Sequence, residues 1–200
     1  MMKKTILILA TLLLAGAVSA QDYQKNILGV RAGLNMAKYS FKDAGSVDSD
    51  PRTSFHVAVT DQILLFNKLP LYLETGLAYS SRGGKVEGMK FQPSYLQIPV
   101  LINYHFNLNN FSIQPFAGAY YGFGIGGKAK QGGEKEDIFG DDGALKRSDV
   151  GVRVGVGFTW KHIYLGAGYD IGCMDLSKDN AFGDAKIRNN CFTISVGYNF

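Results

Sequence analysis

The chain has 200 residues, a formal net charge of +4 and no change in composition that would divide it, so its length fits one domain. It contains 25 Gly, 13 Phe and 11 Tyr, and after the N-terminal segment no apolar run reaches the roughly 20 residues that a spanning helix needs. The small charge argues against a role in binding nucleic acid or a polybasic role at a lipid surface, and the short apolar runs exclude a helical membrane protein.

The first 20 residues have the three parts of a secretory signal peptide. Lys3 and Lys4 precede an apolar run, and small residues lead up to Ala20. This order predicts export and cleavage after Ala20, whereas a membrane anchor is disfavoured because the apolar run is too short. Cleavage removes two lysines and lowers the net charge from +4 to about +2. The predicted domains are a signal peptide, residues 1–20, and one domain over residues 21–200.

Eight segments alternate in side-chain character with a period of two, which predicts β-strands with unlike faces. In chain order they cover residues 28–36, 54–60 with an extension to 64, 71–82, 95–106, 111–125, 149–160, 163–171 and 192–200. One face of each segment carries aliphatic and aromatic side chains. The other face carries mainly glycine, amides and charged residues.

The apolar stripes are long enough to cross a bilayer, which takes roughly 9–11 residues per strand. The sequence therefore predicts an all-β fold, an eight-stranded antiparallel up-and-down transmembrane β-barrel that is apolar outside and polar inside. The alternative is a soluble barrel with an apolar lining, but its polar face would carry Lys and Glu rather than glycine. Links between the segments alternate in length, so we expect short periplasmic turns, long external loops and both termini in the periplasm.

Three stretches resemble a known family. They are "YLQIPVLINYHF" (95–106), "IQPFAGAYYGFGI" (113–125) and the final "GYNF", and they are similar to the PorT-family outer-membrane barrel proteins of Bacteroidetes, with a likeness that extends over about residues 26–200. The resemblance implies a Gram-negative outer-membrane protein that contacts lipid and the barrel-assembly machinery, and some members are linked to assembly of a secretion system for surface proteins. The terminal aromatic residue resembles an assembly signal, which would consist of Val196, Tyr198 and Phe200.

Four charged side chains fall on the face predicted to line the lumen, namely Arg31, Glu74, Arg153 and Asp170. Because buried ions must be paired, we expect Glu74 and Asp170 to neutralise the two arginines. Arg82 and Lys161 fall on the same face near strand ends. A charged constriction in a conducting pore is the alternative, but an eight-stranded barrel has an interior that side chains fill.

Histidine gives only a weak indication of catalysis. His56 has Ser54 nearby in sequence and Ser80 or Ser81 on the predicted neighbouring strand, a combination that lipid hydrolases use with an acid. No acid has a fixed place beside them. His105 and the third histidine, at residue 162, fall at predicted strand ends. The sequence therefore predicts no enzyme activity, no metal site and no cofactor.

The two cysteines, Cys173 and Cys191, flank the last long loop. Export into an oxidising compartment and the proximity of neighbouring strand ends predict a disulfide between them. Simple alternation places the two side chains on opposite faces, so the bridge requires a β-bulge.

The long links are rich in charge and glycine, above all "KAKQGGEKEDIFGDDGALKR" at residues 128–147. This composition is typical of flexible, solvated loops. The acids at 43, 48 and 50 and at 137, 141 and 142 lack the spacing of an EF-hand calcium loop. Two functions remain open. One is a non-enzymatic outer-membrane protein that contacts partners through its loops or periplasmic rim in envelope assembly or secretion, and the other is a narrow channel or small-ligand port.

Overall fold

The computed structural model describes residues 23–42, 49–86, 89–131, 134–139, 143, 145–178 and 186–200. The predicted signal peptide lies outside these residues. The strands are β1 (Asn26–Lys42), β2 (Asp50–Phe66), β3 (Leu69–Ser81), β4 (Gly84–Val86), β5 (Met89–Tyr104), β6 (Phe106–Leu108), β7 (Phe111–Gln131), β8 (Glu134–Asp137), β9 (Ser148–Trp160), β10 (Ile163–Gly172) and β12 (Lys186–Asn199).

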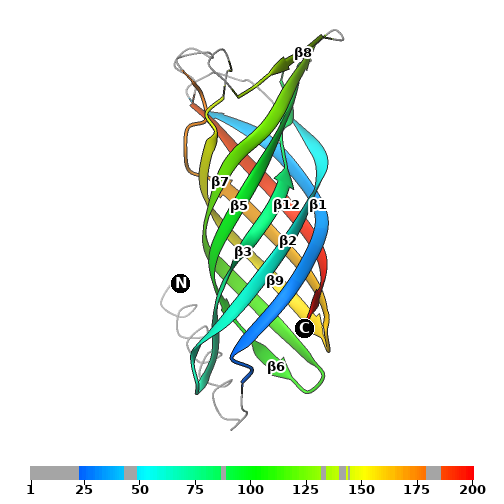
Figure 1. Cartoon of the computed structure of the whole chain (residues 1–200), viewed down its shortest axis with the longest axis vertical. Coiled ribbons are helices and arrows are strands. Elements are labelled where there is room, and N and C mark those ends of the chain that lie inside the picture. Colours follow the sequence, from blue (N-terminus) through cyan, green and yellow to red (C-terminus); the bar gives the residue numbers. More distant parts are fainter. Residues whose placement is uncertain are drawn as a thin grey trace, which may run out of the picture.

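Eight long strands of the described chain form a closed antiparallel barrel (Figure 1). The strands β1, β2, β3, β5, β7, β9, β10 and β12 pair in sequence order, and β12 pairs with β1 from Gly29 opposite Asn199 to Lys42 opposite Lys186. Closure leaves no free sheet edge along the wall. The predicted eight-stranded all-β barrel is therefore confirmed.

The two ends of the barrel differ. Short links at residues 67–68, 109–110 and 161–162 lie at one end with the C-terminus, which we call the turn end. Asn109 and Lys161 adopt positive φ angles of 49° and 54° there, as tight turns require. The longer links lie at the opposite end, the loop end. Among the described residues, no helix is long and apolar enough to cross a membrane.

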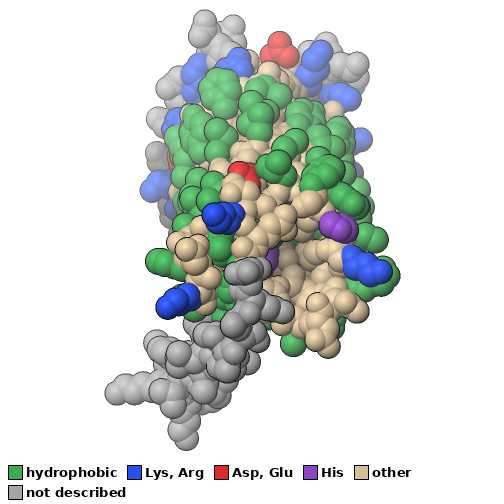
Figure 2. Space-filling view, turned by 60° about the horizontal axis from the view of Figure 1, so that its bottom comes forward, with side chains coloured by type: hydrophobic (Ala, Val, Ile, Leu, Met, Phe, Trp, Pro, Cys, Tyr) green, Lys and Arg blue, Asp and Glu red, His purple; other side chains and the backbone are tan. Residues whose placement is uncertain are grey.

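The wall is apolar outside and polar inside. Outward side chains such as Leu34, Val59 and Val196 are about half exposed, at 51%, 59% and 53%. Inward polar side chains such as Gln62 and Asn103 are buried, at 1% and 0%. Figure 2 shows the belt of hydrophobic side chains around the wall, with basic side chains beyond it. This distribution is the reverse of that in a water-soluble barrel.

Part of the predicted external loop at residues 128–147 is ordered. Strand β7 continues to Gln131, and β8 pairs with its end, so the hairpin projects beyond the wall. Ile138 and Phe139, which follow β8, are 2% and 5% exposed. The expectation of a solvated loop is therefore wrong for these side chains, because the chain turns back into the mouth of the barrel.

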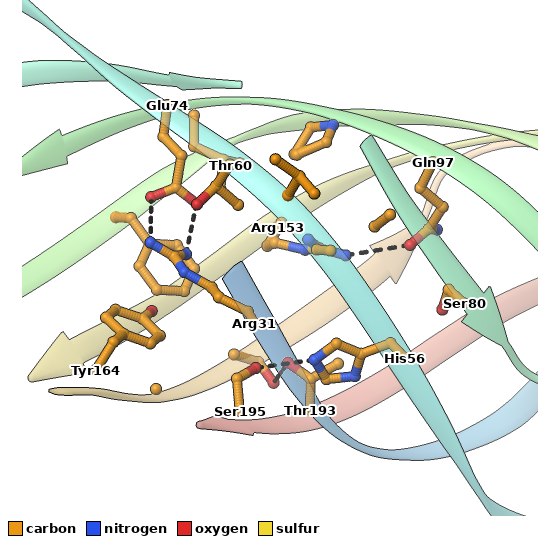
Figure 3. Close-up of a pocket in the computed structure, with 18 of the residues that line it drawn as sticks. Arg31, His56, Thr60, Glu74, Ser80, Gln97, Arg153, Tyr164, Thr193 and Ser195 are labelled. Atoms are coloured by element: carbon orange, nitrogen blue, oxygen red, sulfur yellow. Dashed lines mark hydrogen bonds and ion pairs between the residues drawn. The ribbon is translucent and has the colours of Figure 1, made fainter. Parts of the chain in front are cut away.

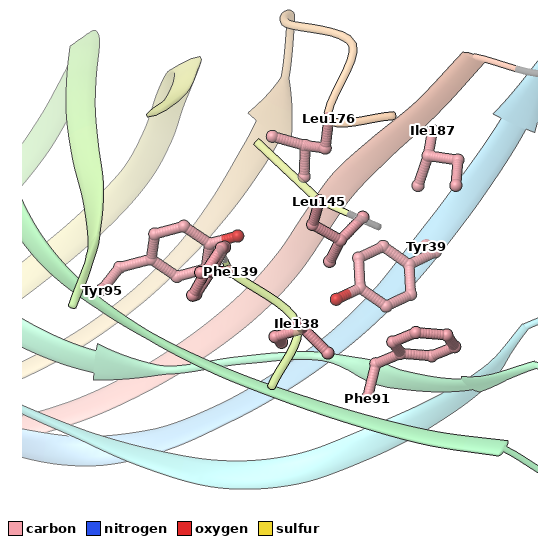
Figure 4. Packing of buried hydrophobic residues seen from close by; sticks show 8 residues of the cluster. All are labelled: Tyr39, Phe91, Tyr95, Ile138, Phe139, Leu145, Leu176 and Ile187. Atoms are coloured by element: carbon pink, nitrogen blue, oxygen red, sulfur yellow. The ribbon is translucent and has the colours of Figure 1, made fainter. Parts of the chain in front are cut away.

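The buried side chains at the loop end form an apolar cluster that we call the cap (Figure 4). Its members are Tyr39, Phe91, Tyr95, Ile138, Phe139, Leu145, Leu176 and Ile187. Backbone hydrogen bonds hold the loops in place, from the Leu145 amide to the Ile138 carbonyl at 3.1 Å and from the Leu176 amide to the Ile187 carbonyl at 2.9 Å. Two loops distant in sequence thus cover the mouth with a common hydrophobic core.

Candidate functional site: the polar interior of the barrel

The first charged group in the lumen is the Glu74 cluster, formed by Arg31, Gln62, Glu74, Asn103 and Tyr164. The Arg31 guanidinium donates two hydrogen bonds to the Glu74 carboxylate, at 2.8 and 3.2 Å. Gln62 and Asn103 donate to the same carboxylate at 2.7 and 3.0 Å. The guanidinium also lies over the Tyr164 ring, 3.8 Å from its centroid. Each charge is therefore compensated where water is excluded.

The second group is the Asp170 cluster, formed by Arg82, Gln97, Asp149, Arg153 and Asp170. Arg153 donates to the Asp170 carboxylate at 2.6 and 2.8 Å, and Arg82 donates to the same carboxylate. Asp149 lies 3.9 Å from the Arg82 guanidinium. Gln97 accepts hydrogen bonds from both arginines, at 3.1 and 3.4 Å. One carboxylate thus joins two arginines in the middle of the barrel.

The Arg82–Asp170 pair crosses the full width of the lumen. Arg82 directly follows β3, and Asp170 lies on β10, which is four strands away in the circle of eight. Both side chains are 0% exposed. Arg82 was predicted to face the lumen near a strand end, and its side chain lies inside the barrel just after β3. Gly83, which follows it, has a φ of 119°, a conformation that favours glycine and turns the chain at the end of β3.

Asp149 is the inward charge that the sequence analysis missed, although the alternation contained the signal for it. Arg82 continues the inward series of β3, two residues after buried Ser80, and Asp149 precedes the outward Val150 of β9. The four predicted lumen residues all point inward, and the structure joins them as Arg31 with Glu74 and Arg153 with Asp170. Lys161 is an exposed turn residue and takes no part in these clusters.

A small cavity of about 50 Å³ lies between the two clusters (Figure 3). His56 borders it, with Nδ1 at 2.7 Å from the Asn35 side-chain oxygen and Nε2 at 3.0 Å from the Ser195 hydroxyl. The Asn35 amide nitrogen is already used by three acceptors, including Ser80 and the Ser81 carbonyl. Its oxygen therefore accepts from Nδ1, and the Ser195 hydroxyl donates to Nε2.

This Ser–His–Asn chain has the order of a nucleophile, base and orienting group, but its surroundings favour a structural role. The enclosed cavity has room for a few water molecules rather than for a lipid or an acyl group. The serines near His56 in the sequence analysis are engaged elsewhere. Ser54 donates to the Ser81 carbonyl, and the Ser80 hydroxyl accepts from Asn35 and Arg82.

A second, open cavity of about 360 Å³ occupies the turn end. The hydroxyl of Tyr72 donates to the Gln24 carbonyl at 3.2 Å, and the Gln24 side chain lies 3.5 Å from the Phe200 carbonyl. His105 stacks on Tyr72 with ring centroids 4.2 Å apart, and His162 contacts the Asn199 carbonyl at 2.8 Å. Both histidines therefore pack into the rim, beside the residues just before β1 and those at the end of β12.

The predicted disulfide is absent, because both cysteines are free thiols. Cys191 is paired with Asp170 across β12 and β10, so its side chain points into the lumen and is 0% exposed. Cys173 follows β10 and is exposed at the loop end. Among the described residues, the pairing of β10 with β12 runs without a bulge that would turn the two side chains to the same face. The alternation of side chains, which already placed the two cysteines on opposite faces, therefore explains why they do not form a bridge.

The free thiols should differ sharply in reactivity. An impermeant maleimide should label folded protein once, at Cys173, because the barrel wall shields Cys191, and twice after denaturation. Intact-protein mass spectrometry counts the labels. A Cys173→Ser variant should remain unlabelled until it is unfolded. Absence of any label without a reductant, with two labels after reduction and denaturation, would instead indicate a bridge.

The predicted assembly residues Val196, Tyr198 and Phe200 point outward on the closing strand, where they are 53%, 44% and 61% exposed. The Phe200 amide donates to the Leu28 carbonyl at 2.8 Å, which joins the last residue to the first strand. Of the acids considered for calcium, those at 43, 48, 141 and 142 lie outside the described residues. In the described part of the chain no group of three or more His, Cys, Asp or Glu is placed to hold a metal ion.

Comparison with known proteins gives the same architecture. Neisserial surface protein A is similar to this chain with a TM-score of 0.52 and 18% identity, over 86% of this chain and 97% of that one. A major outer membrane protein of Thermus thermophilus has a TM-score of 0.49 and 13% identity, over 88% and 100%. No curated protein sequence matches. Residues 8–200 match the outer membrane protein beta-barrel domain, and the chain therefore belongs to this family of outer-membrane barrels.

Proposed function

We propose that this protein is a non-enzymatic, non-conducting outer-membrane barrel that presents its capped loop end to other envelope proteins, as an accessory of envelope assembly or protein secretion. The observation that carries this proposal is the cap. Ile138, Phe139, Leu145 and Leu176 bring two loops together in one buried core. A surface held in this way loses less conformational entropy on binding a partner than free loops would.

The interior supports the non-conducting part of the proposal. A narrow channel through the barrel would have to pass the cap and the ion pair between Arg82 and Asp170, which crosses the lumen from wall to wall. Both features bury side chains that an ion would need to displace. The small-ligand port is therefore the less favoured function.

The proposals about export, orientation, secretion and the assembly signal are supported mainly by the sequence. The signal peptide pattern at residues 1–20 supports export, and the short links at the turn end support an orientation with both termini in the periplasm and the cap outside. The resemblance to the PorT family supports the link to secretion. The outward apolar pattern of Val196, Tyr198 and Phe200, which ends in an aromatic residue, supports their role as a signal for the barrel-assembly machinery.

The test compares the cell-surface and secreted proteomes of a deletion strain with those of its parent. We expect loss of exported proteins, which wild-type protein should restore. An Ile138→Ser/Phe139→Ser variant should not restore export, because polar groups in the cap remove the apolar contacts that hold the loops. Heat-dependent gel migration checks that the variant barrel is folded and present in the outer membrane.

An unchanged proteome would contradict the role in assembly or secretion. Restoration by the cap variant would move the partner surface away from the loop end. Purified protein in planar bilayers is the control for the port, and we expect no stable single-channel currents. Ion-selective currents that change in an Arg82→Gln variant would overturn the non-conducting proposal.

A further inference from the structure

Lysines face one another directly across neighbouring strands at the loop end. Lys90 of β5 is paired in register with Lys85 of β4 on one side and with Lys130 of β7 on the other. Paired residues share a face and have Cβ atoms about 4.5–5.5 Å apart, so these like charges repel.

The lysines point outward from the wall. Phe91, next to Lys90, is buried in the cap, and Ala129, next to Lys130, packs against it. Alternation therefore places Lys90, Lys130 and also Lys128 on the opposite, outward face. Lys85, Lys90 and Lys128 are exposed, and Lys130 is partly exposed. We call Lys85, Lys90, Lys128 and Lys130 the lysine patch.

The patch lies just beyond the apolar belt. On β5 the outward series runs from apolar Leu96 through Ser94 and Gln92 to Lys90. The Ser94 hydroxyl hydrogen-bonds the Tyr79 hydroxyl at 2.9 Å, and an outward tyrosine with its polar tip engaged in this way is typical of a membrane interface. Lys90 lies four residues before Ser94 in the chain and so farther toward the loop end, which places it at the level of the lipid headgroups.

Acids do not neutralise the centre of the patch. In register, Asp50 lies opposite Lys85 and Asp137 lies opposite Lys128, both at its margins. In the described part of the chain, neither Lys90 nor Lys130 forms an ion pair with a carboxylate. Repulsion between neighbouring lysines lowers the stability of the free barrel. A bound anionic group between them would offset this repulsion.

We propose that the lysine patch binds the phosphate groups of a phosphorylated lipid headgroup in the outer leaflet. Lysine ammonium groups on flexible stems serve as point charges for phosphate, and the stems can lie along the apolar belt while the charges reach the headgroup. The lipid is favoured over a soluble anion because its acyl chains would contact the belt directly below. The assignment to the outer leaflet rests on the proposed orientation with the loop end outside.

The test uses purified protein in neutral detergent micelles with diphosphoryl lipid A as the probe and native mass spectrometry to count bound lipid. A Lys90→Gln/Lys130→Gln variant should bind about thirtyfold more weakly, since each basic residue near a charged lipid surface strengthens binding roughly fivefold. The matched control is Lys25→Gln/Lys68→Gln, which removes two exposed lysines at the turn end and should bind like wild type. Lipid A without phosphates should bind poorly to every form.

Equal binding of phosphate-free lipid A would overturn the proposal, as would unchanged binding by the patch variant or equal loss in the control. Displacement by inorganic phosphate at the concentration of the lipid would indicate a soluble-anion site instead. Unchanged heat-dependent migration would show that the patch variant is folded. Binding in micelles does not depend on orientation, which maleimide labelling of Cys173 on intact cells tests separately.

Discussion

An Asp170→Asn substitution should lower the free energy of unfolding of the barrel by about 3–5 kcal/mol, the cost of breaking a buried ion pair by removing one partner. The reason is that Asp170 accepts hydrogen bonds from both Arg82 and Arg153. Asparagine keeps the shape but leaves two guanidinium groups with far less compensation. Urea unfolding in lipid vesicles, followed by the gel mobility of the folded form, measures the change.

Asp149→Asn is the matched control because it removes a carboxylate of the same cluster at 3.9 Å from Arg82 and keeps an amide beside Asn189. Its effect should be clearly smaller. Adding Arg153→Gln to Asp170→Asn should recover part of the lost stability, because it removes one of the two uncompensated charges. Equal stability of the Asp170 variant and wild type would show that the cluster contributes little to holding the walls together.

A Gly33→Ala substitution should be similarly damaging, with a loss of about 3 kcal/mol or more, at the upper end for overpacked sites. A Cβ at residue 33 would lie 1.9 Å from the Ile194 carbonyl oxygen and 2.7 Å from His56 Cε1. The first contact is with the backbone of the closing strand, which cannot move without opening the β1–β12 seam. His56 and Ser195 also meet across this glycine, since both are paired with it.

The yield of folded barrel after refolding into detergent micelles measures this effect, together with the urea midpoint of what does fold. Gly126→Ala is the control, because a Cβ there meets no atom within 4 Å. We expect the control to refold like wild type. If Gly33→Ala also refolded with full yield and an unchanged midpoint, the close approach at the seam would not limit assembly.

The fold was predictable because a strand that separates lipid from a packed interior must alternate at every residue. This constraint is local, so it can be read along each segment, as in β9, where Val150, Val152 and Val154 face outward with Arg153 between them. Closure follows from the same argument, since an open edge in a membrane would leave backbone groups without partners. The inward direction of Arg31, Glu74 and Asp170 came from the same alternation.

The cap could not be predicted in this way. Ile138 and Phe139 lie in a segment dominated by charge and glycine, and their burial depends on a turn that brings them against Tyr95 of a distant strand. Arg82 was expected to face the lumen, but the group that it pairs with could not be predicted, for a related reason. Its partner Asp170 is 88 residues away in the chain, and only the closed barrel brings the two walls together.

The sequence by itself determined the strands, their faces, the closed barrel and most of the inward charges, because alternation is imposed residue by residue by the two environments of the wall. Only the tertiary structure decided which charges meet, that the cysteines stay apart, and that the loops fold into a cap. These outcomes depend on the register between strands and on the width of the lumen. Both are fixed only when all eight strands have paired, and neither can be inferred from the sequence of a single segment.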